Sequence, residues 1–304
     1  MKSRIPESAW LFLKIAATAA ALYFVFARID GNKLLEAWGG LSLPPLLAAL
    51  ALFVLSKMIS AVRLNLFLKA SGMPLGEAEN MKLYHLGMFY NTFLPGGIGG
   101  DGYKVYILKK RFRLPAGRIV AAVAADRVLG VHALFVLAVL FFYGTGLEPR
   151  IRPWAWISLP ASYGLLAMVV HKLWGHFRAA AAAASLLSLV VQACQLGTAW
   201  LIMLALGMHA REAEYLVLFL VSSLVAVLPV TVGGAGSREV AFLLGARHLG
   251  LDADLAISLS LTFYGITLLV SLLGAVFVFR PPLGEPPLGE PPDARRPERE
   301  VRAE

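Results

Sequence analysis

Charged side chains occur within the apolar part of this chain, where an ionised group needs a partner or water. Asp126 and Arg127 lie about seven residues into the apolar stretch 119–142. Arg127 and Lys104 could hold a phosphate, while Asp101 or Asp126 orients them or binds a proton. A structural network of ion pairs is the alternative, and the residue types leave both readings open.

The partners of Asp126 and Arg127 must come from elsewhere in the chain. Adjacent residues of a helix point about 100° apart, so these two side chains cannot neutralise each other face to face. The charged residues expected to pair with them are Asp101, Lys104, Arg238 and Glu239. Lys57 lies near the expected cytoplasmic end of the apolar stretch 43–62, and we predict that its ammonium extends toward the membrane interface.

Two eleven-residue segments, 94–104 and 228–238, match each other without a gap. Their shared pattern is L-P-x-x-[IV]-G-G-x-G-x-[KR]. Each segment follows an apolar region that is too short to cross a membrane, 82–95 or 215–229. The repeated motif indicates an internal duplication, although the similarity fades outside it.

The composition of the motif predicts a broken helix. Proline ends a helix, and glycine permits unusual backbone angles and close approach of other groups. A new helix beginning near the last glycine would place free N–H groups and a basic side chain at the break, which suits an anion such as a lipid phosphate. The alternative is that the glycines only let helices pack closely. The binding reading predicts these ligand-contacting residues: Asn91, Pro95, Gly97, Gly99, Gly100, Asp101, Lys104, Asp126, Arg127, Pro229, Gly233, Gly234, Gly236, Arg238 and Glu239.

The elements that position these residues are membrane helices. The chain is 58% apolar and 15% charged, whereas a soluble domain has about 45–50% and 25%. Six stretches qualify or nearly qualify as membrane spans, the first as a retained signal anchor: 9–27, 43–62, 119–142, 155–170, 180–206 and 255–279.

The distribution of lysine and arginine orients these spans. Residues 104–118 carry six basic residues and no acidic one, so they should be cytoplasmic. With the N-terminus inside, the first two spans return the chain to the cytoplasm at Arg63. We therefore expect 82–95 to enter the membrane and return to the same side, and 215–236 to do so from the outside. The prediction is an all-α polytopic protein with about six full spans and two re-entrant broken helices related as an inverted repeat.

Composition also limits the function classes. A net charge of +9 lies mostly in short loops between apolar stretches, where it reports membrane orientation, so we expect no nucleic-acid partner. We find no metal-ligand constellation, catalytic constellation or nucleotide-binding loop, and therefore expect neither metal, cofactor nor enzymatic activity. Residues 1–280 form the predicted membrane domain, and the Pro-rich residues 281–304 a disordered cytoplasmic tail.

Three motifs in order resemble the lysylphosphatidylglycerol synthase transmembrane, or flippase-like, family of bacterial and archaeal inner-membrane proteins. The likeness is carried by the runs 91–101, 126–130 and 228–239, and it covers essentially residues 9–280. The resemblance implies a multi-pass protein of the bacterial inner membrane that acts on polar lipids, with a lipid-synthesis enzyme as a possible partner. Only a short tail follows Arg280, so the soluble aminoacyl-transfer domain of the two-part synthases, and their synthase activity, are not expected.

The function predicted from these observations is translocation of an anionic phospholipid or lipid-linked headgroup, with its phosphate held where the broken helices restart. One alternative is an integral-membrane transferase that moves a sugar or phosphoryl group on a lipid carrier. The other is a non-catalytic scaffold of a lipid-synthesis complex, for which the basic run 104–118 would dock anionic lipid or protein. Both termini are expected in the cytoplasm.

Overall fold

The computed structural model describes residues 39–93, 99–145, 152–227, 237–280 and 282–283. Within these ranges every regular element is a helix, which confirms the all-α prediction. The longer helices are, in chain order, α3 (Leu43–Ala70), α4 (Glu77–Phe93), α5 (Gly99–Phe112), α6 (Ala116–Thr145), α7 (Arg152–Leu173), α8 (Arg178–Ala205), α9 (Glu212–Val227), α10 (Ser237–Leu249) and α11 (Ala253–Leu272). Three short helices complete them: η1 (Gly175–Phe177), η3 (Leu273–Ala275) and α12 (Val276–Phe279).

Four helical segments are long and apolar enough to cross a membrane: α3, most of α6, η1 with α8, and α11 through α12. They correspond to the predicted spans 43–62, 119–142, 180–206 and 255–279. The predicted span 155–170 forms the 22-residue helix α7, which is outside this set and contains Pro160. The predicted span 9–27 lies outside the described residues, as does the tail from residue 284.

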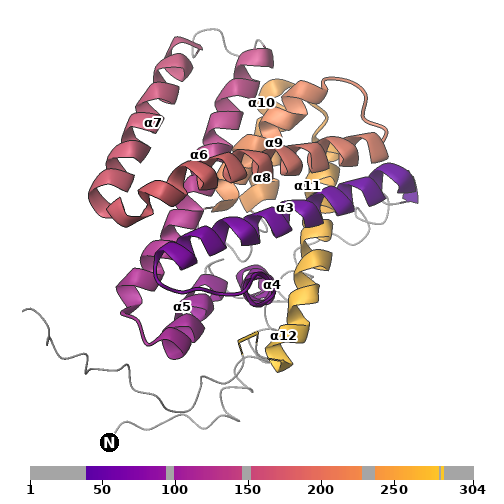
Figure 1. Ribbon diagram of the computed structural model, residues 1–304. Coiled ribbons are helices and arrows are strands. Elements are labelled where there is room, and N and C mark those ends of the chain that lie inside the picture. Colours follow the sequence, from indigo (N-terminus) through magenta and orange to yellow (C-terminus); the bar gives the residue numbers. More distant parts are fainter. Residues whose placement is uncertain (1–38, 94–98, 146–151, 228–236, 281, 284–304) are drawn as a thin grey trace, which may run out of the picture.

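Helices α3 and α8 pack side by side and run antiparallel (Figure 1). At one end of the pair, the Ser42 N–H donates to the Ala205 carbonyl at 2.9 Å. At the other end, the rings of Phe67 and Phe177 meet edge to face with centroids 5.2 Å apart. This pair forms the centre of the molecule, and α4, α6, α7, α9 and α11 each pack against one or both of its helices.

Helices α4 and α5 form an antiparallel hairpin around the first motif. Near the turn, the rings of Tyr90 and Tyr103 lie 4.8 Å apart, and at the open end Arg111 reaches Glu79 at 3.5 Å. A side chain at Gly100 would overlap the carbonyl oxygen of Gly87, so the helices can approach this closely only with glycine at position 100. Close packing is therefore one role of the motif glycines, as the packing alternative predicted.

Helices α9 and α10 form a second antiparallel hairpin around the second motif. Near its turn Arg238 donates to the Ser223 hydroxyl at 3.2 Å, and at its open end Arg211 donates to the Leu249 carbonyl at 3.0 Å. The described parts of the regions 82–95 and 215–236 therefore lie on α4 and α9, and each of these helices is followed by an antiparallel one. The turns themselves, 94–98 and 228–236, are outside the described residues.

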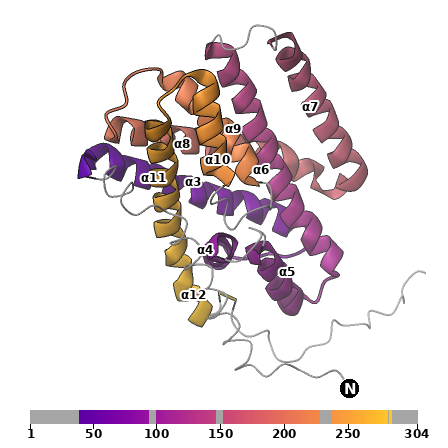
Figure 2. The same ribbon diagram turned by 180° about the vertical axis from the view of Figure 1, so that it is seen from behind.

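The order of elements repeats along the chain. A long helix, a hairpin and another long helix occur as α3–α4–α5–α6 and again as α8–α9–α10–α11. The last helix of each set packs against the hairpin of the other set, α6 on α9 and α11 on α4. In Figure 1, α6 rises from the lower to the upper end of the molecule while α11 descends, and Figure 2 shows the same relation from behind.

Candidate functional site

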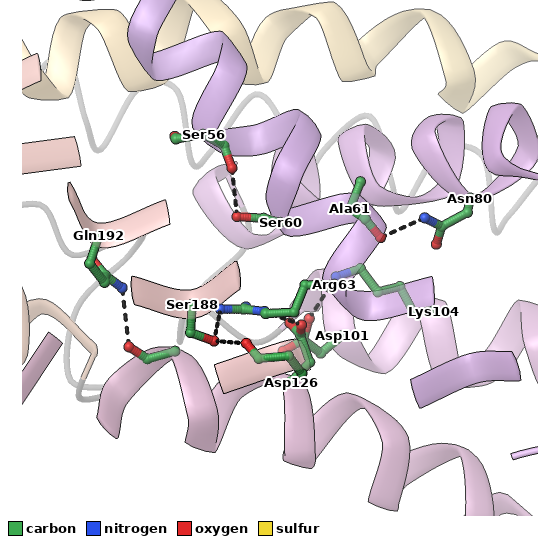
Figure 3. Close-up of polar contacts among 12 residues, drawn as sticks. Ser56, Ser60, Ala61, Arg63, Asn80, Asp101, Lys104, Asp126, Ser188 and Gln192 are labelled. Carbon is green, nitrogen blue, oxygen red and sulfur yellow. Dashed lines mark hydrogen bonds and ion pairs between the residues drawn. The ribbon is translucent and has the colours of Figure 1, made fainter. Parts of the chain in front are cut away.

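A buried ion pair joins α3 and α6, and a hydrogen bond connects it to α8 (Figure 3). Arg63 Nε donates to Asp126 Oδ1 at 2.7 Å, and Arg63 Nη1 donates to the Ser188 hydroxyl at 2.9 Å. Arg63 is 5% exposed and Asp126 is 7% exposed. Because a buried charge is tolerated only when it is paired, these contacts explain how both residues lie inside an apolar helix bundle.

The partner of Asp126 differs from the one expected from the sequence. None of the four predicted candidates pairs with it, and Arg63 had been placed at the cytoplasmic end of the span 43–62. In the structure α3 continues through Ala70, so Arg63 lies within the helix and faces α6. The physical reason is that a guanidinium with a buried carboxylate partner need not reach water.

Asp101 is at the centre of a second set of polar contacts. It accepts a hydrogen bond from Lys104 Nζ at 3.2 Å, one from Asn91 Nδ2 at 3.4 Å, and it pairs with Arg127 Nε. Asp101 was a predicted partner of Arg127, and the structure confirms it. The adjacent residues Asp126 and Arg127 thus turn to different partners, as their helical geometry requires.

Two further contacts complete this region. The Asn91 side chain also accepts from the Gly100 N–H at 2.8 Å, which satisfies a free amide at the start of α5. Lys104 is 5% exposed, and its ammonium lies 4.9 Å from the centre of the Tyr84 ring. Lys104 is therefore held by a carboxylate and an aromatic face together.

Gly130 gives the Arg63 guanidinium its space. A Cβ added at Gly130 would lie 3.1 Å from Arg63 Nη1. The Gly130 carbonyl accepts from Gln192 Nε2 at 3.1 Å, which adds a bond between α6 and α8. In the segment 126–130, Asp126 therefore pairs with α3, Arg127 pairs with α5, and Gly130 leaves space for the Arg63 side chain. We call Arg63, Asp101, Lys104, Asp126 and Arg127 the first charged cluster; it holds three cations and two carboxylates.

A second charged cluster, formed by Lys57, Arg238 and Glu239, lies beside the second hairpin. The Arg238 guanidinium lies 4.8 Å from the centre of the Phe263 ring and 5.5 Å from that of Phe219. Glu239 accepts from the Ser260 hydroxyl at 2.9 Å. The two motif cations, Lys104 and Arg238, therefore belong to different clusters.

Sequence reasoning did not assign Lys57 to this site. Its ammonium lies 4.4 Å from the centre of the Phe53 ring, and Phe53 meets Phe263 edge to face at 5.5 Å. Lys57 is within electrostatic range of Arg238 in the same cluster and of Arg63 in the first cluster. The only signal in the sequence was a lysine within an apolar stretch, which is also typical of a residue at the membrane interface.

A model of the lysylphosphatidylglycerol synthase TM region matches residues 11–181 and 169–274. The chain belongs to this family. It is also 31% identical over 109 residues to the UPF0104 membrane protein PH1989 of Pyrococcus horikoshii. The aligned region covers 35% of this chain and 32% of the relative. The chain thus matches about a third of that relative's length. These matches and the four long apolar helices identify a membrane protein of a lipid-related family.

The structure locates only part of the family motif. Asn91 lies on α4, and Gly99, Gly100, Asp101 and Lys104 lie on α5. Asp126 and Arg127 lie on α6, and Arg238 and Glu239 lie in the first turn of α10. The remaining predicted ligand contacts lie outside the described residues: Pro95, Gly97, Pro229, Gly233, Gly234 and Gly236. Within the described ranges, no group of three or more His, Cys, Asp or Glu residues could hold a metal ion.

Proposed function

We propose that this protein moves a polar lipid with an anionic headgroup between the leaflets of a bacterial inner membrane. The observation that carries the proposal is the pair of antiparallel hairpins, each with a motif cation on its returning helix and each packed among apolar helices. Charged side chains at membrane depth are costly unless they face protein or water. A path lined by such residues would carry the headgroup while the acyl chains stay in the bilayer.

The arrangement of the helices supports an inverted repeat with two re-entrant hairpins. Helices α3 and α8 run antiparallel, and α6 and α11 run in opposite directions (Figure 1). The open ends of the two hairpins then face opposite sides of the membrane, and both termini are cytoplasmic. Inverted repeats of this kind place a substrate site near the membrane midplane, between the repeats.

The two clusters would serve this function differently. The first cluster joins α3, α5 and α6 through ion pairs and α8 through the hydrogen bond of Arg63 to Ser188, so it holds the first hairpin in place. Its charges are largely neutralised by one another. The second cluster contains two cations and one carboxylate, which suits attraction of an anion. Energy for net movement would come from an ion gradient, from mass action or from a partner enzyme that supplies the lipid.

The transferase alternative has less support from the described residues. A general base needs a carboxylate that is available to take a proton. Asp101 and Asp126 are instead each paired with a guanidinium, and taking up a proton would break that ion pair. We therefore propose no catalytic role.

Reconstitution into liposomes with headgroup-labelled anionic lipids tests the proposal. We expect leaflet exchange with the wild-type protein and its loss in Lys104→Ala and Arg238→Ala. Lys69→Ala is the matched control, because Lys69 lies on α3 but forms an exposed pair with Glu77 at 2.7 Å. Covalent modification of the lipid would instead support a transferase. If neither leaflet exchange nor lipid modification is seen with a broad lipid panel, the scaffold alternative is supported.

A further inference from the structure

Lys57 and Arg238 are basic residues without a carboxylate at ion-pair distance among the described parts of the chain. Lys57 contacts the Phe53 ring, and Arg238 contacts two phenylalanine rings and the Ser223 hydroxyl. Both side chains are partly buried, and the Phe53 and Phe263 rings that they contact meet edge to face at 5.5 Å. The two cations therefore contact the same pair of rings and lie within electrostatic range of each other. Like charges in an apolar setting repel each other, and a bound anion would reduce that repulsion.

The difference between the two motif copies explains why Arg238 lacks a partner of this kind. In the first copy Asp101 precedes Lys104 by three residues and pairs with it. In the ungapped alignment the second copy has Ala235 at the position of Asp101. The first motif therefore carries a carboxylate three residues before its cation, whereas the second motif does not.

Tyr264 supplies an independent indication of a ligand. The tyrosine is 4% exposed, and its hydroxyl has no hydrogen-bond partner in the described structure. It lies within electrostatic range of Arg238 and Glu239. A buried hydroxyl without a partner is costly, and an anion oxygen at this point would accept a hydrogen bond from it.

An apolar groove adjoins this cluster between α3 and α11. Its volume is about 550 Å³, and its lining includes Leu46, Leu50, Gly265, Ile266 and Leu269. Phe53 continues the α3 side of the groove by one turn toward Lys57, and Thr262, which also lines it, precedes Phe263. The lining of the groove therefore ends, on α3 and on α11, next to the residues whose rings the two cations contact.

We propose that Lys57, Arg238 and Tyr264 bind the phosphodiester monoanion of a lipid headgroup, with an acyl chain in the adjoining groove. The two cations and Glu239 together carry one net positive charge, which matches a singly charged phosphodiester better than a doubly charged phosphomonoester. The inference rests on the proposed function in that it names the headgroup class, but binding at this site can be measured without any translocation.

Native mass spectrometry and calorimetry of the detergent-purified full chain test the binding site. The probe is dioctanoyl phosphatidylglycerol, with dioctanoyl phosphatidic acid, dioctanoylglycerol and chain-free glycerophosphoglycerol as comparisons. We expect phosphatidylglycerol to bind most tightly. Removing one charged contact in Lys57→Gln or Arg238→Gln should weaken binding about tenfold or more, and Tyr264→Phe should weaken it less. Lys57→Arg should retain binding, and Lys69→Gln is the matched control.

A thermal unfolding measurement separates binding from a structural role. Because Lys57 has no counter-charge, Lys57→Gln should unfold without ligand at no lower a temperature than wild type, while losing the stabilisation that phosphatidylglycerol gives. A clearly less stable ligand-free variant, or unchanged lipid affinity in both Gln variants, overturns the site. Equal affinity for glycerophosphoglycerol overturns the role of the groove.

The outcomes also separate this inference from the proposed function. Lipid exchange that persists in Lys57→Gln and Arg238→Gln, with unchanged binding, refutes the site but leaves translocation standing. Lipid binding that is lost in Lys57→Gln and Arg238→Gln, without any leaflet exchange by the wild-type protein in liposomes, supports the site and refutes translocation.

Discussion

Arg63 and Asp126 neutralise each other inside the helix bundle. Removing one of them should therefore destabilise the protein more than removing both. Asp126→Leu or Arg63→Met leaves one buried charge without its counter-charge, so we expect each to lower the unfolding free energy by about 3–5 kcal/mol. The double variant Arg63→Met/Asp126→Leu should recover much of that loss. Denaturant unfolding in detergent measures the cycle. Additive losses would contradict the ion pair.

The exposed pair of Lys69 and Glu77 provides the comparison for that cycle. Its side chains are 49% and 56% exposed, so solvent screens the interaction. Lys69→Met should change the unfolding free energy by no more than about 1 kcal/mol.

Gly130 makes a second prediction at the residue scale. Its substitution by alanine would place a methyl group 3.1 Å from Arg63 Nη1, so the guanidinium must shift away from Asp126 or Ser188. We expect Gly130→Ala to destabilise the protein by about 1–3 kcal/mol despite the better helix propensity of alanine. Gly102→Ala, at an exposed helical position with open space, should be neutral or stabilising. Equal unfolding midpoints for the two variants would refute this role for Gly130.

Sequence reasoning predicted some of these contacts and missed others for a definite reason. That Asp126 and Arg127 need separate partners follows from helix geometry, and Asp101 was among the partners named. Arg63 was missed because it lies 63 residues from Asp126 and because the apolar pattern placed the end of its helix too early. A charge near the end of an apolar run looks the same whether it faces water or a buried carboxylate.

The hairpin of α4 and α5 depends on the absence of a side chain at Gly100. A methyl group there would overlap the Gly87 carbonyl, so Gly100→Ala should push the two helices apart and weaken the Asn91 cap. We expect cross-linking of cysteines introduced at Tyr90 and Tyr103, in a Cys194→Ser background, to fall sharply. Gly102→Ala is again the matched control. Undiminished cross-linking would mean that the hairpin tolerates a wider separation.

At the level of elements, the proline and glycine pattern predicted both breaks and the return of the chain at each of them. It could not decide between a binding cavity and close packing, because glycine serves both. Around Gly100 the described contacts are those of close packing. Around Arg238 the second motif has alanine at the position of Asp101, and the contacts of the guanidinium are with two aromatic rings and a hydroxyl. These contacts come from helices that lie far apart in the sequence, so the sequence pattern did not predict them.

The arrangement of the whole molecule predicts that the two hairpins open toward opposite sides of the membrane. Lys109 lies exposed at the end of α5 and Arg247 lies exposed at the end of α10. Because α6 and α11, which follow these hairpins, run in opposite directions, the two positions should differ in the compartment they face. Single cysteines at 109 and 247, in the Cys194→Ser background, report this directly.

A membrane-impermeant maleimide applied to inverted membrane vesicles should label the cysteine at 109 and spare the one at 247, and right-side-out vesicles should give the reverse. The basic run 104–118 sets the expected orientation, since lysine and arginine concentrate on the cytoplasmic side. Detergent permeabilisation should make both positions reactive, which controls for local burial. Labelling of both cysteines from one side would place both hairpins on the same face. Alternating access between opposed hairpins would then be impossible, even if the binding site at Arg238 remained.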